Sequence, residues 1–114
     1  MPAHSIGDVL SGATRLIAIV GDPIAQVKSP AGVTRGLLER GLNCIVVPIH
    51  ASSADLATFM DGASVARNID GLIATVPHKF AMAERCATLS DAAQFLGAAN
   101  VLRRNADGRW HGDM

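Results

Sequence analysis

The chain has 114 residues, of which 49% are hydrophobic, and its ten basic and ten acidic side chains give no net charge. That length fits one domain with its own core, and the charge balance excludes the basic face that a nucleic-acid-binding protein needs. There is no apolar run of about 18 residues that could cross a membrane, and the first residues lack the pattern of a secretory signal, so we expect a cytoplasmic protein.

The first third of the chain predicts one buried strand and one helix. Residues 1–13 form a polar lead-in, and the apolar run 16–20 (LIAIV) has the length of a strand covered on both faces, as in a parallel sheet. Ser29 fits the N-cap of a helix that begins with a proline and runs over 30–40, where Gly41 ends it. A strand followed by a helix is typical of the start of an α/β domain.

The middle of the chain repeats the order of strand and helix. Residues 44–49 (CIVVPI) predict a second strand, whose internal proline favours an edge of the sheet. Ser52 or Ser53 is expected to cap a helix over 54–67, and residues 72–76 (LIATV) predict a third strand. Strands joined by crossover helices should lie parallel to one another.

The last third predicts two short helices and a hairpin. Helices are expected over 78–87 and, after a serine cap, over 91–96. Strands over 100–104 and 109–111 flank residues 105–108 (NADG), where Asp-Gly is a favoured hairpin turn. The whole order predicts an α/β fold of three layers: a mixed, mostly parallel sheet with helices on both faces and a C-terminal β-hairpin.

Three polar segments lie at predicted strand ends, where ligands bind in open α/β sheets. They are residues 21–30 (GDPIAQVKSP), 75–79 (TVPHK) and 97–100 (GAAN). The second segment delivers the hydroxyl of Thr75 and the amine of Lys79. A lysine in a partly enclosed cleft can exchange protons near neutral pH, so Lys79 is the first candidate for a catalytic group.

In this order and spacing the segments resemble the substrate-binding domain of the shikimate dehydrogenase family, where they read G-N-P-I-x-H-S-x-S-P, N-V-T-x-P-x-K and G-A-x-N-T. The resemblance runs from about Arg15 to the last residue. It implies that Lys79 is a catalytic group, paired with an aspartate, which contacts the hydroxyl that loses its proton as hydride leaves the carbon. It also implies that Ser29 binds the substrate carboxylate at the helix N-terminus and that Thr75 and Asn100 bind substrate hydroxyls.

Two family positions are substituted, which leaves the substrate open. Val27 stands where the family has the first serine of S-x-S, and Ile73 stands where it has the asparagine of N-V-T. Each lost polar contact costs about 1–3 kcal/mol for the same ligand. The resemblance implies an NADP-linked oxidoreductase that interconverts 3-dehydroshikimate and shikimate in chorismate and aromatic amino-acid biosynthesis. The alternatives are a divergent paralogue acting on quinate or a related polyol acid, and a stand-alone, non-catalytic binding domain.

No G-x-G-x-x-G turn follows a predicted strand, so we expect residues 1–114 to be a single substrate-binding domain that binds no NADP itself. The expected partners are a shikimate-like hydroxy acid and the family's separate C-terminal NADP-binding domain, without which the chain should be inactive. The family's catalytic aspartate would fall about two residues beyond Met114, although a one-gap register would make it Asp113. Cys44 and Cys86 are expected to be free thiols and no metal site is expected, because the cysteines and histidines form no cluster.

Overall fold

A six-stranded sheet forms the centre of the part of the chain that the computed structural model describes, which is residue 7 and residues 10–114. Its strand order is β2-β1-β3-β5-β6-β4. β1 lies parallel to both β2 and β3, β5 lies antiparallel to β3 and β6, and β4 lies parallel to β6. The strands are β1 (Arg15–Gly21), β2 (Cys44–His50), β3 (Ile69–Ala74), β4 (Thr88–Leu89), β5 (Val101–Arg104) and β6 (Trp110–Asp113).

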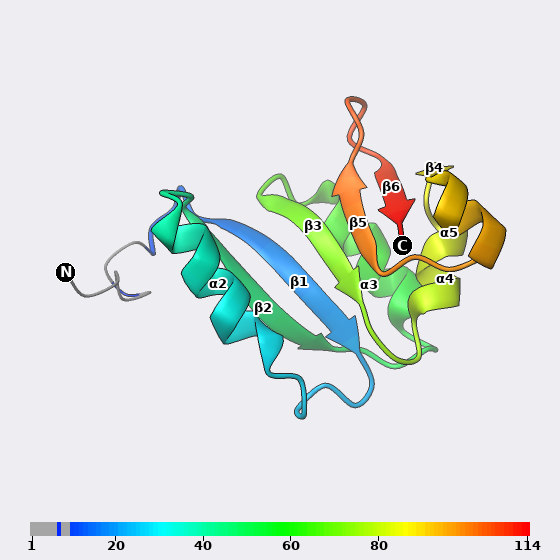
Figure 1. Cartoon of the computed structure of the whole chain (residues 1–114), viewed down its shortest axis with the longest axis horizontal. Coiled ribbons are helices and arrows are strands. Elements are labelled where there is room, and N and C mark those ends of the chain that lie inside the picture. Colours follow the sequence, from blue (N-terminus) through cyan, green and yellow to red (C-terminus); the bar gives the residue numbers. More distant parts are fainter. Residues whose placement is uncertain (1–6, 8–9) are drawn as a thin grey trace.

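Helices pack on both faces of this sheet (Figure 1). They are α2 (Ser29–Glu39), α3 (Leu56–Val65), α4 (Lys79–Glu84) and α5 (Asp91–Leu96). Because side chains alternate along a strand, β1 contributes side chains to two apolar clusters, one on each face of the sheet. Val20 packs in the cluster that holds Met60 of α3 and Met82 of α4, whereas Ile19 packs in the cluster that holds Leu37 of α2. The expected mixed, mostly parallel α/β fold with a C-terminal hairpin is confirmed.

Several local predictions are confirmed. β2 lies at an edge of the sheet, as the proline inside it indicated. The hairpin of β5 and β6 turns through Gly108, which has the left-handed φ of 86° that a glycine accepts readily. Ser90 caps α5, because its hydroxyl accepts a hydrogen bond of 3.2 Å from the amide of Ala93. Local turn and cap chemistry therefore determines these boundaries.

Other local predictions are wrong. Lys28, not Ser29, is the N-cap of α2, and its side chain makes no capping bond; Ser29 is the first residue of the helix. α3 begins at Leu56 after Asp55, so neither predicted serine caps it, although the hydroxyl of Ser52 accepts a bond of 3.3 Å from the Asp55 amide in the preceding turn. Before α3 the chain makes a turn in which the amide of Asp55 also donates a bond of 3.1 Å to the carbonyl of Ser52.

The region between α4 and α5 also differs from expectation. α4 ends at Glu84, three residues earlier than predicted, because the amide of Ala87 donates a bond of 2.8 Å to the carbonyl of Trp110. The chain then forms β4, which pairs with β6 over two residues only. A strand this short has no apolar alternation of its own, so it left no signal in the sequence.

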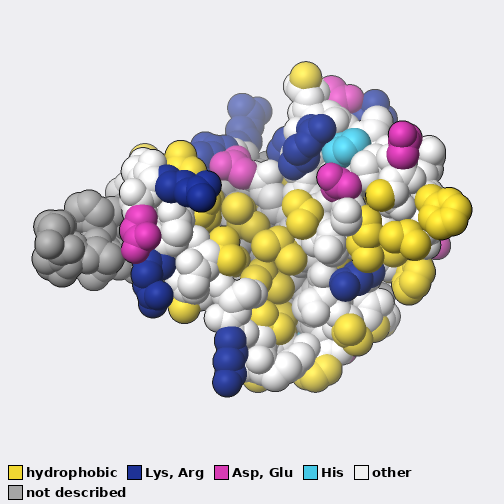
Figure 2. All heavy atoms as spheres, in the orientation of Figure 1, with side chains coloured by type: hydrophobic (Ala, Val, Ile, Leu, Met, Phe, Trp, Pro, Cys, Tyr) yellow, Lys and Arg dark blue, Asp and Glu magenta, His cyan; other side chains and the backbone are white. Residues whose placement is uncertain are grey.

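Exposed apolar side chains gather at the end of the molecule that α4 and α5 form (Figure 2). Phe80 of α4 is 64% exposed and Phe95 of α5 is 90% exposed. Phe80 directly follows Lys79 at the start of α4. None of the described helices is long and apolar enough to span a membrane.

Candidate functional site

Two backbone hydrogen bonds join the loop after β1 to the loop after β3. The amide of Thr75 donates to the carbonyl of Val20, and the amide of Asp22 donates to the carbonyl of Val76, both at 3.0 Å. β1 and β3 are neighbouring parallel strands, so their carboxyl ends lie at the same edge of the sheet. The first two motif segments therefore form one continuous piece of surface.

The third motif segment is joined to the same edge by three more backbone bonds, each of 2.9 Å. The amide of Ala74 donates to the carbonyl of Asn100, and the amide of Asn100 donates to the carbonyl of Asp113. The amide of Ala99 donates to the carbonyl of Lys79. The segments predicted from sequence are thus brought together by the sheet itself, with Asn100 between the end of β3 and the end of β6.

The side chains of the four predicted site residues are not used to hold the described fold together. Thr75, Lys79 and Asn100 are partly buried and Ser29 is exposed. Within the described part of the chain, none of the four side chains makes a hydrogen bond or an ion pair. Two hydroxyls, one amine and one amide are therefore free to bind a ligand that carries hydroxyl and carboxylate groups. Their individual roles stay predictions.

The two substituted family positions lie in an apolar layer. Val27 and Ile73 are both partly buried, and both pack against the cluster of Ile19, Ile24 and Val46 on the α2 side of the sheet. Neither replacement leaves a polar group without a partner, which explains how the fold accepts them. Whether they face a ligand stays a prediction.

Asp113 is already engaged by its own surroundings. One oxygen of its carboxylate accepts hydrogen bonds of 2.7 Å from the hydroxyl of Ser90 and from the amide of Met114. The bond from Ser90 is the main cause that holds the pKa of Asp113 below its ordinary value. An ionised, hydrogen-bonded carboxylate at the end of β6 fits a structural role at the α5 cap.

Two histidines make contacts that the sequence pattern did not indicate: His78 within the second motif segment, and His50 before the helix α3. His78 is completely buried, and its Nε2 lies 2.6 Å from the carbonyl oxygen of Ala51. His50, the last residue of β2, pairs with Asp22 through Nε2 at 2.6 Å. Both contacts join residues 27 or 28 positions apart in the chain. Such pairings depend on the three-dimensional arrangement of the strands, so sequence spacing could not have predicted them.

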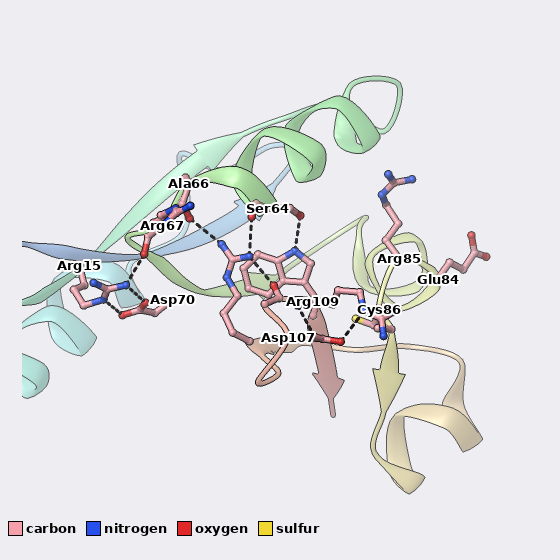
Figure 3. A pocket seen from close by; sticks show the side chains of 14 residues that line it. Arg15, Ser64, Ala66, Arg67, Asp70, Glu84, Arg85, Cys86, Asp107 and Arg109 are labelled. Carbon is pink, nitrogen blue, oxygen red and sulfur yellow. Dashed lines mark hydrogen bonds and ion pairs between the residues drawn. The ribbon is translucent and has the colours of Figure 1, made fainter.

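A cavity of about 680 Å³ lies at the opposite end of β1 and β3, and none of the predicted site residues lines it. Arg15, at the start of β1, and Asp70 point toward each other there (Figure 3). Their two hydrogen bonds measure 2.6 and 2.7 Å, the forked geometry typical of arginine and a carboxylate. The opposite charges of Arg15 and Asp70 therefore neutralise each other.

Arg104 also lines this cavity and donates hydrogen bonds to carbonyls at the end of α3. Its guanidinium donates to the carbonyls of Ala63, Ser64 and Ala66 at 2.9 to 3.0 Å, and its carbon lies 4.0 Å from the centre of the Trp110 ring. A cation at the carboxyl end of a helix is stabilised by the helix dipole and by the otherwise unpaired carbonyls. Two of the arginines that line the cavity, Arg15 and Arg104, therefore make bonds that hold the fold together.

Both cysteines are free thiols, as expected from sequence. Burial raises the pKa of Cys44, and burial raises the pKa of the Cys86 thiol to about 11. Thiols with raised pKa values are poor nucleophiles and poor metal ligands. Among the described residues, no group of three or more histidine, cysteine or acidic side chains is placed to hold a metal ion.

The chain is similar in sequence to known proteins over most of its length. The chain is 37% identical over 103 residues to the shikimate dehydrogenase (NADP(+)) of Thermosynechococcus vestitus, covering 90% of this chain and 35% of that protein. It is 31% identical over 104 residues to the shikimate dehydrogenase (NADP(+)) of Microcystis aeruginosa, covering 91% of this chain and 36% of that protein. The chain therefore spans about a third of the length of these relatives.

A solved structure matches the fold over a similar span. The structure of shikimate 5-dehydrogenase from Listeria monocytogenes in complex with shikimate and NAD superposes with a TM-score of 0.85 at 26% identity, covering 92% of this chain and 36% of that one. The model of the shikimate dehydrogenase substrate binding domain matches residues 19–102. That span holds all three motif segments, and the chain belongs to the family of shikimate dehydrogenase substrate binding domains.

Proposed function

We propose that this chain is the substrate-binding domain of an NADP-dependent shikimate dehydrogenase, a single domain over residues 1–114 of a longer, cytoplasmic enzyme. The observation that carries the proposal is the meeting of the three motif segments at one edge of the sheet, held by backbone bonds of 2.9 to 3.0 Å. The relatives named above are NADP(+) shikimate dehydrogenases of which this chain spans about a third. Two free thiols fit a reducing compartment such as the cytoplasm.

In this proposal the free side chains at this edge of the sheet bind different groups of the substrate. Ser29, the first residue of α2, binds the substrate carboxylate, which the positive end of the helix dipole also attracts. Thr75 and Asn100 bind ring hydroxyls. Thr75 can do so because its methyl group packs toward Gly21, which leaves the hydroxyl available. The preferred substrate is shikimate, since the names of the curated relatives do not favour the quinate alternative.

Lys79 carries the proton chemistry in this proposal. As the alcohol is oxidised, its uncharged amine accepts the hydroxyl proton; in the reverse direction its ammonium group donates a proton to the new alkoxide. Lys79 is partly buried and makes no ion pair with a carboxylate among the described residues, so its nitrogen is available to a substrate hydroxyl. Asp113 is not the preferred partner, because Ser90 and Met114 already occupy one oxygen of its carboxylate.

This chain does not fit the nicotinamide cofactor. A dinucleotide site needs a glycine that leaves the backbone open to the pyrophosphate after a strand. Gly21 ends β1, but the space beside it is filled by Thr75, and Pro23 follows within the loop. NADP, which accepts or supplies the hydride, therefore belongs to the remainder of the longer enzyme.

The test is an assay of the longer protein that carries this domain, with shikimate and NADP. Oxidation of shikimate should reduce NADP, and quinate should react with a much lower kcat/KM. Calorimetric titration of the 114-residue chain with NADP is the matched control, and no binding at micromolar concentration is expected. A longer protein that reduces no NADP with shikimate would refute the proposal.

A further inference from the structure

His78 joins three loops beneath the candidate site. Its side chain is 0% exposed, and its Nε2 lies 2.6 Å from the carbonyl oxygen of Ala51, which follows β2. The amide of Ala51 in turn donates a bond of 3.2 Å to the carbonyl of Gly21, the end of β1. A carbonyl oxygen only accepts, so Nε2 carries the proton of the first bond. The imidazole thus connects the loop after β3 to the end of β2, and the backbone bond from Ala51 extends this connection to the end of β1.

The backbone of His78 holds the two predicted ligands of its own loop. Its amide donates to the carbonyl of Thr75, and its carbonyl accepts from the amide of Met82 in α4, both at 2.9 Å. Lys79 is the next residue, so its Cα lies about 3.8 Å from that of His78. Fixing the buried ring therefore also fixes where Thr75 and Lys79 leave the backbone.

A purely packing role does not account for this residue. A hydrophobic side chain of similar size would fill the same space without bringing a polar ring into the core, where unpaired polar groups cost free energy. Nδ1 of His78 is in fact buried without a hydrogen-bond partner among the described residues. The fold tolerates that cost, and the contact that offsets it is the bond from Nε2 to Ala51.

We propose that His78 is a positioning residue, whose Nε2–H bond to Ala51 holds the loop of Thr75 and the start of α4, with Lys79, against the chain that follows β2. The consequence for turnover rests on the proposed function, whereas the consequence for the position of Lys79 does not. A displacement of a catalytic group by about 1 Å can lower turnover about 100-fold. Loss of the bond should therefore lower kcat much more than it raises KM.

Three variants distinguish the effect of the Nε2–H hydrogen bond from the effect of the ring's packing. In His78→Gln an amide N–H reaches nearly as far as Nε2 and can still donate to Ala51. In His78→Asn the amide is one carbon shorter and falls short, and in His78→Phe the ring remains without a donor. In the longer enzyme we expect His78→Phe and His78→Asn to lower kcat about 100-fold with KM within about threefold, and His78→Gln to stay within about fivefold of wild type.

A second measurement reads the position of Lys79 without any turnover. The chain has only two lysines, Lys28 and Lys79, so methylation with ¹³C-formaldehyde gives two lysine resonances that Lys79→Arg assigns. We expect the Lys79 resonance to shift in His78→Phe and to return to the wild-type position in His78→Gln. The Lys28 resonance, from an exposed side chain, should stay unchanged in every variant, and circular dichroism of each variant checks that the chain is folded.

The outcomes are distinct. If His78→Phe leaves both kcat and the Lys79 resonance at wild-type values, or if His78→Gln loses as much as His78→Phe, the bond does not position the lysine and the inference is wrong. If His78→Phe does not fold, His78→Gln decides alone: retained kcat and resonance support the inference, and their loss overturns it. A Lys79→Ala enzyme with full turnover would refute the proposed function but leave the resonance test of His78 valid.

Discussion

The methyl group of Thr75 occupies the space in which a side chain on Gly21 would begin. A Cβ at Gly21 would also lie 3.2 Å from the carbonyl oxygen of Val76 and 3.3 Å from the side chain of Ile24. Two of these neighbours belong to the loop that carries Lys79. Glycine at the end of β1 is therefore what allows the first two motif segments to touch.

Gly21→Ala should lower the free energy of unfolding by about 1–3 kcal/mol, because the added methyl group forces apart two loops whose backbones are bonded. Gly36→Ala is the matched control, since a Cβ at Gly36 in α2 meets nothing within 4 Å. That control should be neutral or more stable by up to about 1 kcal/mol. Urea denaturation of both variants measures the difference, and a Gly21→Ala chain as stable as wild type would contradict the packing described here.

Arg104→Leu should destabilise the chain by about 2–3 kcal/mol, because the last carbonyls of α3 lose a charged donor and Trp110 loses its cation partner. Arg103→Leu is the control, since the Arg103 side chain makes only a bond of 3.4 Å to the neighbouring carbonyl of Arg104. Circular dichroism in urea gives both stabilities. Equal losses in the two variants would mean that Arg104 does not hold the end of α3.

Cys86 should react slowly with thiol reagents in the native chain. Its pKa of about 11 leaves few thiolates at pH 8, so alkylation in a Cys44→Ser chain should be about 100-fold slower than in the urea-unfolded chain. Because the pKa is raised, the native rate should increase about tenfold per pH unit up to about pH 11. A native rate equal to the unfolded rate at pH 8 would contradict the burial of this thiol.

Val27→Ser combined with Ile73→Asn tests whether these two positions face the substrate. If they do, the restored polar contacts should raise kcat/KM for shikimate in the longer enzyme. Each contact should stabilise the bound transition state by up to about 1–3 kcal/mol. Some stability should be lost, since both side chains pack against the apolar cluster on the α2 side. Quinate provides the comparison substrate. An unchanged kcat/KM for both acids would show that neither position faces the ligand.

Much of the fold follows from local chemistry that the sequence displays. The proline in β2 indicated an edge strand, the Asp-Gly turn indicated the hairpin, and Ser90 indicated the start of α5. Each of these signals acts within a few residues of the feature that it predicts. The convergence of the first two motif segments also follows from sequence, because parallel strands present their carboxyl ends at one edge. The third segment joins them because β5, which it precedes, lies antiparallel to β3.

What sequence could not provide are contacts between distant parts of the chain. Arg104 serves carbonyls 38 to 41 residues away, and His78 binds a carbonyl 27 residues away. Ser29 has the residue type of an N-cap, yet it is the first residue of α2, and Lys28 is the N-cap. In each case the tertiary path of the backbone decides which polar group is within reach.

The most direct test of the proposed function is the turnover of Lys79→Ala compared with Lys28→Ala in the longer enzyme, with shikimate and NADP. Lys28 is the other lysine of the chain and precedes α2 as its exposed N-cap, so the pair of variants removes the same type of side chain at two places. Loss of a general acid–base group should lower kcat by about 10²- to 10⁴-fold in Lys79→Ala, with Lys28→Ala near wild type. A Lys79→Ala enzyme whose kcat stays within about threefold of wild type would contradict the assignment of Lys79 as the catalytic group.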